Sequence, residues 1–268
     1  MICWPVVQTR RVCVSSWKWR SLRMNDAYLY PYSAEEARRR YELSLWRASH
    51  QENIACKLAI EEAIRQHYDG AHLDKECLAE VLQEFGYKRT AWVLANTIQQ
   101  KEWDGRFSPR NRAWADQTYI PPDQRHNLDF VVTSHPAILD GVVDQYRAAY
   151  QGLGLFGPGQ CEPNSFEELD YEGKVLVLST DTLKESYWTT RAQLWYAHDG
   201  FGCSPKAIGR SIRCTCLGDG EMIRWNRTDF IGALKDEFLP EWAKEKLMEL
   251  KGQEQNNDSP AMGGMTME

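Results

Sequence analysis

A short segment between residues 103 and 114 concentrates the residue types that bind other macromolecules. Aromatic rings and arginines are common at the energetic centres of protein interfaces, and the same pairing binds single-stranded nucleic acid. Two interpretations stay open. The segment is either a binding surface, or its aromatic rings pack in a core while its arginines face solvent. The candidate interaction surface consists of Trp103, Asp104, Arg106, Phe107, Arg110 and Trp114.

A histidine next to a serine and a carboxylate suggests an alternative, enzymatic site. His135 follows Ser134 and lies five positions before Asp140, a set that could support acid–base or nucleophilic chemistry. The simpler interpretation is that Ser134 caps a helix on whose surface Asp140 lies. The sequence has no G-x-S-x-G nucleophile motif to favour catalysis.

A second histidine–carboxylate pair ends a predicted strand. His198-Asp199 precedes Gly200, and an Asp-Gly dipeptide is typical of a turn. The pair has no third catalytic member in the sequence pattern. We therefore predict no catalytic residues. If the protein is instead an enzyme, the candidate site consists of His135, His198 and Asp199.

The cysteines are interpreted as reduced thiols. Cys214 and Cys216 would share one face of a strand, with Cys203 and Cys161 upstream. A zinc site needs four convergent ligands, and these cysteines include no C-x-x-C pair. Cysteine also fills strand interiors as a small apolar residue. We predict no metal and no cofactor.

The charge balance argues for a protein partner. The chain has 32 basic and 38 acidic residues, a net charge of −6. Broad binding to a phosphate backbone requires a basic surface, so nucleic acid is disfavoured but not dismissed. No apolar run reaches the roughly 18 residues of a membrane helix, so we expect a cytoplasmic protein without a membrane partner.

The first 23 residues differ from the rest of the chain. They contain five basic residues, no acidic residue and no apolar stretch of the kind a signal peptide requires. We interpret residues 1–23 as a misassigned or disordered extension, with translation starting at Met24. Without them the balance becomes 27 basic against 38 acidic residues, a net charge of −11.

Helical periodicity, strand alternation and glycines predict an α+β protein in two parts. A helical domain is expected over 24–150, followed by a Gly/Pro linker at 151–164. A small sheet-containing module with C-terminal helices is expected over 165–251, and a disordered tail over 252–268. Gly86 is expected to end one helix, since glycine favours helix termini.

Within the second part, strands are predicted at 174–178, 193–198 and 212–216. Gly218-Asp219-Gly220 indicates a turn, so 222–225 is expected to return as a hairpin partner. Thr228 or Asp229 would then cap a helix that includes Phe230, Ile231, Leu234 and Phe238.

Several sequence stretches resemble the domain-of-unknown-function family numbered 3849. They are Asn-Ile-Ala-Cys-Lys at 53–57, Glu-Phe-Gly-Tyr-Lys-Arg at 84–89, Trp-Val-Leu-Ala-Asn-Thr at 92–97 and Asp-Gly-Arg-Phe-Ser at 104–108. The resemblance extends from about Leu29 to Tyr150. The C-terminal part resembles a module that often follows such domains, through stretches around 200–202, 209–216, 220–225 and 239–243.

This resemblance implies a genomic context for the gene but no enzymatic activity. Proteins of this kind are typically encoded on conjugative and integrative elements of gut Firmicutes, some near antirestriction genes. The family supplies no catalytic residues to carry over. We therefore expect a non-enzymatic accessory protein of a mobile element that binds another macromolecule, with a host-defence or antirestriction role. The alternatives are a nucleic-acid-binding module and an enzyme with a His/Asp/Cys site.

Overall fold

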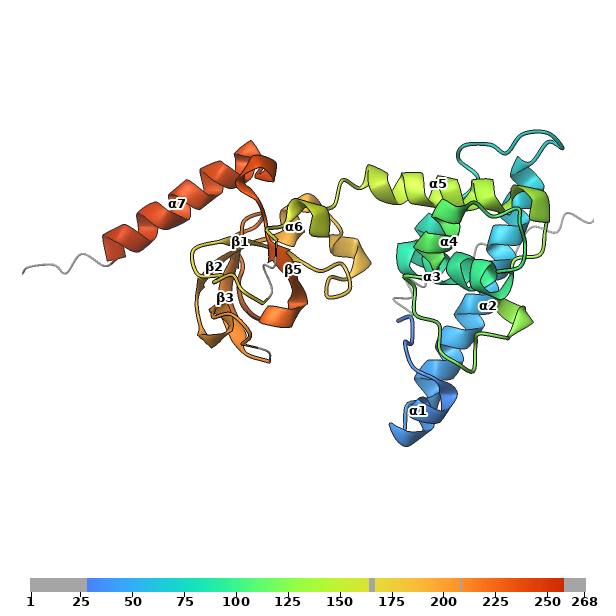
Figure 1. Cartoon of the computed structure of the whole chain (residues 1–268), viewed down its shortest axis with the longest axis horizontal. Coiled ribbons are helices and arrows are strands. Elements are labelled where there is room, and N and C mark those ends of the chain that lie inside the picture. Colours follow the sequence, from blue (N-terminus) through green and yellow to red (C-terminus); the bar gives the residue numbers. More distant parts are fainter. Residues whose placement is uncertain (1–27, 164–166, 208, 258–268) are drawn as a thin grey trace, which may run out of the picture.

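The computed structural model describes residues 28–163, 167–207 and 209–257 (Figure 1). The predicted α+β class is confirmed: helices dominate the first part and an antiparallel sheet forms the second. The proposed extension at 1–23 lies outside the described residues, as does the end of the predicted tail.

Within the described residues, five α-helices build the N-terminal part, and their apolar stripes form one core. Cys56, Ile60 and Ile64 of one stripe are fully buried, because residues three or four positions apart share a helix face. They pack against Val93 and Leu94 from a neighbouring helix. The helices are α1 (Ala34–Arg39), α2 (Leu43–His67), α3 (Ala79–Gln100), α4 (Pro109–Ala115) and α5 (Leu139–Gly152).

The second part is a five-stranded antiparallel sheet with the order β4-β3-β2-β1-β5. Its β3–β4 hairpin confirms the prediction from the alternation and the glycine turn, with Cys214 opposite Ile223 and Ile212 opposite Trp225. The strands are β1 (Val175–Leu178), β2 (Leu194–Asp199), β3 (Ser211–Cys216), β4 (Met222–Asn226) and β5 (Phe230–Ala233).

One predicted helix is wrong. The segment that begins at Phe230 forms strand β5, which pairs with β1 so that Leu176 lies opposite Ala233. Its apolar spacing fits a helix, but pairing with the free edge of β1 satisfies the backbone of both strands, and tertiary context overrides local preference. The helix α7 (Glu241–Asn257) follows and continues beyond the predicted start of the tail at 252.

The two faces of the sheet pack against different elements. Val175 and Val177 of β1 contact the cluster that includes Trp242 and Leu247 of α7, which lies beside the sheet in Figure 1. Leu176 and Leu178 belong to the opposite cluster with Trp188. This split follows from the two-residue alternation of a strand buried on both faces.

A carboxylate joins the sheet part to the helical part. Glu185, in the 3-10 turn Glu185–Tyr187, accepts hydrogen bonds from the backbone N–H groups of Tyr87 at 2.6 Å and Lys88 at 2.7 Å. These N–H groups are free because α3 breaks at Gly86, whose φ is 76°. Trp188 adds a ring contact 6.0 Å from Tyr87. The break predicted at Gly86 is therefore present, although the chain continues as a helix after it.

Among the described residues, no helix is both long enough and apolar enough to cross a membrane.

Candidate interaction site

The segment from 101 to 108 forms a turn that leaves the C-terminal end of α3. The backbone N–H of Lys101 still donates to the carbonyls of Thr97 and Ile98, which closes the helix. The N–H of Asp104 then donates to the Lys101 carbonyl at 2.8 Å, and Asp104-Gly105 continues the turn. The direction of the chain therefore changes within a few residues after α3.

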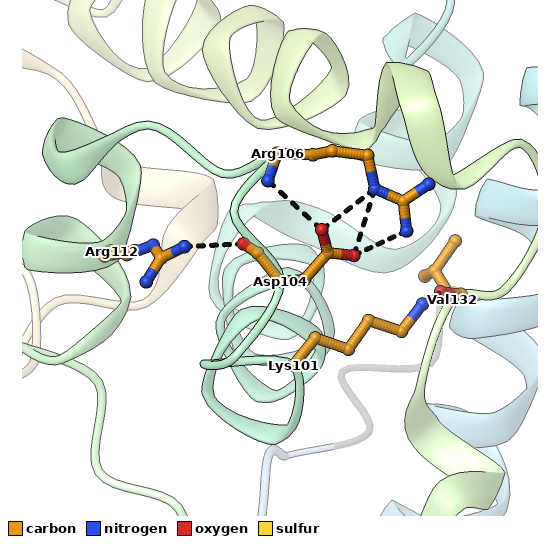
Figure 2. A network of polar contacts seen from close by, with 5 residues as sticks. All are labelled: Lys101, Asp104, Arg106, Arg112 and Val132. Atoms are coloured by element: carbon orange, nitrogen blue, oxygen red, sulfur yellow. Dashed lines mark hydrogen bonds and ion pairs between the residues drawn. The ribbon is translucent and has the colours of Figure 1, made fainter.

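A buried carboxylate holds this turn from the inside. Asp104 is 5% exposed and accepts from the Arg106 side chain, with Nη2 at 2.6 Å from Oδ2 and Nε at 2.8 Å from Oδ1 (Figure 2). The backbone N–H of Arg106 also donates to Oδ1 at 3.1 Å. The side-chain hydrogen bonds and the backbone hydrogen bond from Arg106 lower the pKa of Asp104 to about 2. Two-pronged arginine–carboxylate pairs of this kind fix geometry as well as charge.

Two further cations connect the turn to neighbouring parts of the chain. Arg112 of α4 donates to three of its carbonyls: Glu102 at 2.8 Å, Asp104 at 2.5 Å and Phe107 at 3.2 Å. Lys101 Nζ reaches across to the Val132 carbonyl at 3.0 Å, as Figure 2 shows, and burial lowers the pKa of Lys101. The three Arg112 contacts satisfy carbonyls that a turn leaves without partners, and the Lys101 contact ties the start of the turn to Val132, so the backbone around residue 103 is fixed.

The helix α4 is itself anchored at its start. The Ser108 side chain caps it by accepting from Asn111 N. Asp140 of α5 accepts from the N–H of Ser108 at 3.0 Å and from Asn111 Nδ2 at 2.8 Å. The carboxylate that the enzymatic alternative placed near His135 therefore has structural partners, and the turn is braced between α3 and α5.

The structure separates the six predicted interaction residues into three groups. Trp103 is 81% exposed, and Arg106 and Arg110 are also exposed. Asp104 and Phe107 are buried, Phe107 within the helical core. Trp114 is half-buried, with its ring 5.4 Å from that of Tyr146. We call the exposed set of Trp103, Arg106 and Arg110 the Trp103 surface.

The Trp103 surface lies inside a segment that matches a family model. Residues 29–151 match the model of the family described as Protein of unknown function (DUF3849). This match confirms the resemblance of the N-terminal part, which the sequence placed from about Leu29 to Tyr150, and does not extend to the C-terminal part. No curated protein and no solved structure shows a significant match to the chain.

The histidine that the enzymatic alternative takes from the matched segment, His135, has ordinary surroundings. His135 is exposed, has a left-handed backbone with φ of 47° and lies edge-on to Tyr68 with 5.2 Å between ring centroids. It precedes α5, whereas His198 and Asp199 lie on β2 of the sheet part. The structure thus places the residues of the enzymatic alternative in different parts of the chain.

The sheet residues of that alternative are engaged with neighbouring strands. His198 Nε2 lies 2.7 Å from Thr215 Oγ1, and its ring lies 4.8 Å from Tyr196. Asp199 forms an ion pair with Arg213 at 2.6 Å. The contacts of His198 with Thr215 and of Asp199 with Arg213 join β2 to β3, which a strand-end His-Asp pair can do without catalysis.

The described cysteines are buried free thiols. Burial raises the pKa of Cys214 to about 12 and that of Cys216 to about 11. A thiolate is the form that binds metal or attacks a substrate, so these side chains serve as packing groups in the strands. No group of three or more potential metal ligands gathers within the part of the chain that the structure describes.

Sequence reasoning missed two residues that organise the DUF3849 segment. Glu185 and Lys88 join the segment to the sheet: Lys88 Nζ donates to the carbonyls of Leu183 at 3.2 Å and Asp181 at 3.3 Å. The signal that could have revealed this contact was the glycine within Glu-Phe-Gly-Tyr-Lys-Arg. A glycine that breaks a helix exposes backbone N–H groups, and those groups need an acceptor from elsewhere.

Proposed function

We propose that this protein acts by binding another protein through the Trp103 surface. The observation that carries the proposal is the exposure of Trp103, 81%, on a turn whose backbone is held by Asp104, Arg106 and Arg112. Because Trp103 is exposed, its indole contributes little burial free energy to folding. The exposed indole on a fixed turn is therefore better explained by contact with a partner protein than by a role in the fold.

The rigidity of the turn favours affinity. Binding has a cost in ordering loops and side chains, and a surface that is already fixed avoids much of it. Tryptophan and arginine dominate hot spots because one side chain supplies a large apolar area and the other a planar set of donors. Arg106 is held by Asp104 yet half-exposed, so its outer edge can still meet a carboxylate or carbonyl of a partner.

The acidic balance supports a protein partner over nucleic acid. The net charge of −6 and isoelectric point near 5.6 oppose the nonspecific attraction that brings proteins to phosphate backbones. The Trp103 surface nevertheless contains an aromatic ring and two arginines, which is the combination that stacks on single-stranded bases. Nucleic-acid binding is therefore the second candidate function. In that case the affinity for nucleic acid should fall strongly as the salt concentration rises.

We further propose that the protein is encoded on a mobile genetic element. The resemblance described above supports an accessory protein of a conjugative or integrative element, in gut Firmicutes, that acts in the cytoplasm. Its partner would be a host-defence protein or a component of element maintenance, in keeping with an antirestriction role. This part of the proposal rests on association with neighbouring genes and not on the geometry of the site.

Comparative affinity capture tests the proposal. The tagged full-length protein, its Trp103→Ala variant and a Phe201→Ala control are expressed in a host that carries defence systems, and extracts are treated with nuclease. Phe201 is 84% exposed and lies in the sheet part. It is therefore an aromatic residue about as exposed as Trp103 that lies outside the Trp103 surface. We expect one protein at near-equal stoichiometry with the wild type and Phe201→Ala, and a loss of at least tenfold with Trp103→Ala. Equal capture by all three would contradict the proposal.

A further inference from the structure

Strand β4 is an open edge of the sheet. It is the first strand in the order β4-β3-β2-β1-β5, and no described strand pairs with its outer side. The opposite edge is paired at the end of β5: Glu162 N donates to the Ala233 carbonyl at 2.8 Å and Lys235 N donates to the Gln160 carbonyl at 3.0 Å. Open edges attract other strands, and most proteins cover or disrupt them.

The hydrogen-bond register shows which backbone groups of β4 are available. Cys216 N donates to the Glu221 carbonyl and Arg227 N to the Arg210 carbonyl, so the odd-numbered residues of β4 face β3. In an antiparallel pair the alternate residues point away from the partner strand. Met222 and Arg224 therefore direct their N–H and C=O groups to the open side. At Asn226 the N–H is already taken by Asp229 Oδ2 at 2.8 Å.

The side chains of β4 define what a pairing strand must look like. Ile223 and Trp225 are half-buried, and Trp225 lies edge-on to Trp195 at the rim of the sheet core, with 5.4 Å between rings. Met222 and Arg224 are exposed on the other face. An added strand would continue both faces, so its residues should be apolar beside Ile223 and Trp225 and polar beside Arg224.

Charge at this edge specifies the polar residues. Arg224 lies directly opposite Arg213 in the register, an arrangement of like charges that destabilises a strand pair. Asp199 compensates Arg213 at 2.6 Å, whereas within the described residues Arg224 has no carboxylate at ion-pair distance. An acidic residue from a new strand would neutralise Arg224. A second copy of this chain, paired symmetrically about Arg224, would instead place two guanidinium groups opposite each other.

We propose that β4 accepts an extended segment of another protein in which apolar and acidic residues alternate. The segment adds a sixth strand, pairs with the backbone groups of Met222 and Arg224, and places an acidic residue beside Arg224. This is strand addition, in which the main chain supplies affinity and alternate side chains supply specificity. The site lies in the sheet part and does not depend on the Trp103 surface.

Peptide binding to the full-length protein tests this inference. The probes are fluorescent seven-residue peptides with blocked ends, one alternating valine with glutamate and one alternating valine with lysine. Fluorescence anisotropy should show binding of the glutamate peptide only. Arg224→Glu should weaken that binding at least tenfold and allow the lysine peptide to bind. Arg110→Glu, the same charge change on the Trp103 surface, should leave both results unchanged.

A backbone variant separates strand pairing from simple charge attraction. Met222→Pro removes an outward N–H but none of the hydrogen bonds to β3, and edge strands tolerate proline at such positions. With its circular dichroism spectrum unchanged, this variant should bind the glutamate peptide at least tenfold more weakly. If the Met222→Pro variant does not fold, the binding of the two peptides to Arg224→Glu still tests whether β4 binds an acidic strand. Failure of the wild type to bind the glutamate peptide, or displacement of that peptide by a DNA oligonucleotide, would overturn the inference.

Discussion

The carboxylate of Glu185 occupies the space that any side chain at position 86 would need. A Cβ atom built on Gly86 would overlap Glu185 Oε2, and the backbone there has a φ of 76°. Glycine at this position therefore does two things. It breaks α3 so that the N–H groups of Tyr87 and Lys88 become free, and it leaves room for the carboxylate that accepts from them.

Replacing this glycine should weaken the joint between the two parts. Gly86→Ala combines an unfavourable left-handed backbone with displacement of Glu185, and we expect it to lower the free energy of unfolding by about 3 kcal/mol. Urea unfolding followed by tryptophan fluorescence measures this change. Gly70→Ala is the matched control, because Gly70 also has a positive φ, 101°, but has nothing near its Cβ position. It should cost only about 1 kcal/mol.

A second variant separates the clash from the backbone strain. In a Glu185→Ala background the overlap is gone, so adding Gly86→Ala should cost about as little as Gly70→Ala does. Residues in contact show such non-additive effects, whereas distant ones do not. Strict additivity of Gly86→Ala and Glu185→Ala would show that the carboxylate does not sit against Gly86.

The ion pair between Asp104 and Arg106 should make the stability of the fold depend on pH. The pKa of Asp104 is lowered from 3.8 to about 2 in the folded protein. The ionised carboxylate therefore stabilises the fold above about pH 4, and this contribution is lost as the pH falls from about 4 towards 2. The stability difference between the wild type and Asp104→Asn should be constant near neutral pH and shrink over that interval. A difference independent of pH would contradict the assignment.

A buried arginine should be essential to the sheet part. Arg227 is fully buried, stacks 3.7 Å from the centroid of the Tyr171 ring and donates to the carbonyls of Leu169 at 2.6 Å, Cys203 at 2.8 Å and Gly202 at 3.1 Å. Its replacement by methionine would leave these carbonyls without this donor. We expect a loss of about 3–5 kcal/mol in urea unfolding, since each buried unsatisfied group costs about 1–3 kcal/mol. A loss below about 1 kcal/mol would show that water or another donor replaces it.

The buried thiols should resist alkylation in the folded state. Burial raises the pKa of Cys56 to about 12 and that of Cys161 and Cys203 to about 11, so almost no thiolate exists at pH 8. Iodoacetamide followed by peptide mass spectrometry should modify these residues only after unfolding in urea. Rapid modification of Cys214 or Cys216 in the native protein would instead revive a catalytic or metal-binding role for the strand cysteines.

Local patterns in the sequence predicted the local structure well. Alternation over Ile212, Cys214 and Cys216 and the glycine turn after them specify a hairpin, because the two-residue period and the turn residues act within a few positions. Helix periodicity around Ile60 and Ile64 was equally reliable. The segment at Phe230 was mispredicted because its apolar spacing suits a helix, while the free edge of β1, distant in sequence, decides its conformation.

The composition of the candidate site could be predicted, but not its arrangement. The pattern between 103 and 114 does not show that Asp104 and Phe107 are buried while Trp103 is exposed. That outcome depends on Arg112 and Lys101 holding the turn and on Asp140 anchoring α4 from another helix. The contact of Glu185 with Tyr87 spans almost a hundred residues, and no short-range pattern encodes such a pair.

Site-specific photo-crosslinking detects a protein bound at the Trp103 surface while Trp103 itself stays in place. A photoreactive amino acid replaces Glu102, which is exposed and whose contact with Arg112 uses only its carbonyl, so that Trp103 stays intact. The same group at Phe201 serves as the control position. We predict a covalent adduct with one defined protein from position 102, none from position 201, and loss of the first adduct when Trp103→Ala is added. Equal adducts from both positions, or an adduct at 102 that survives Trp103→Ala, would contradict binding through the Trp103 surface.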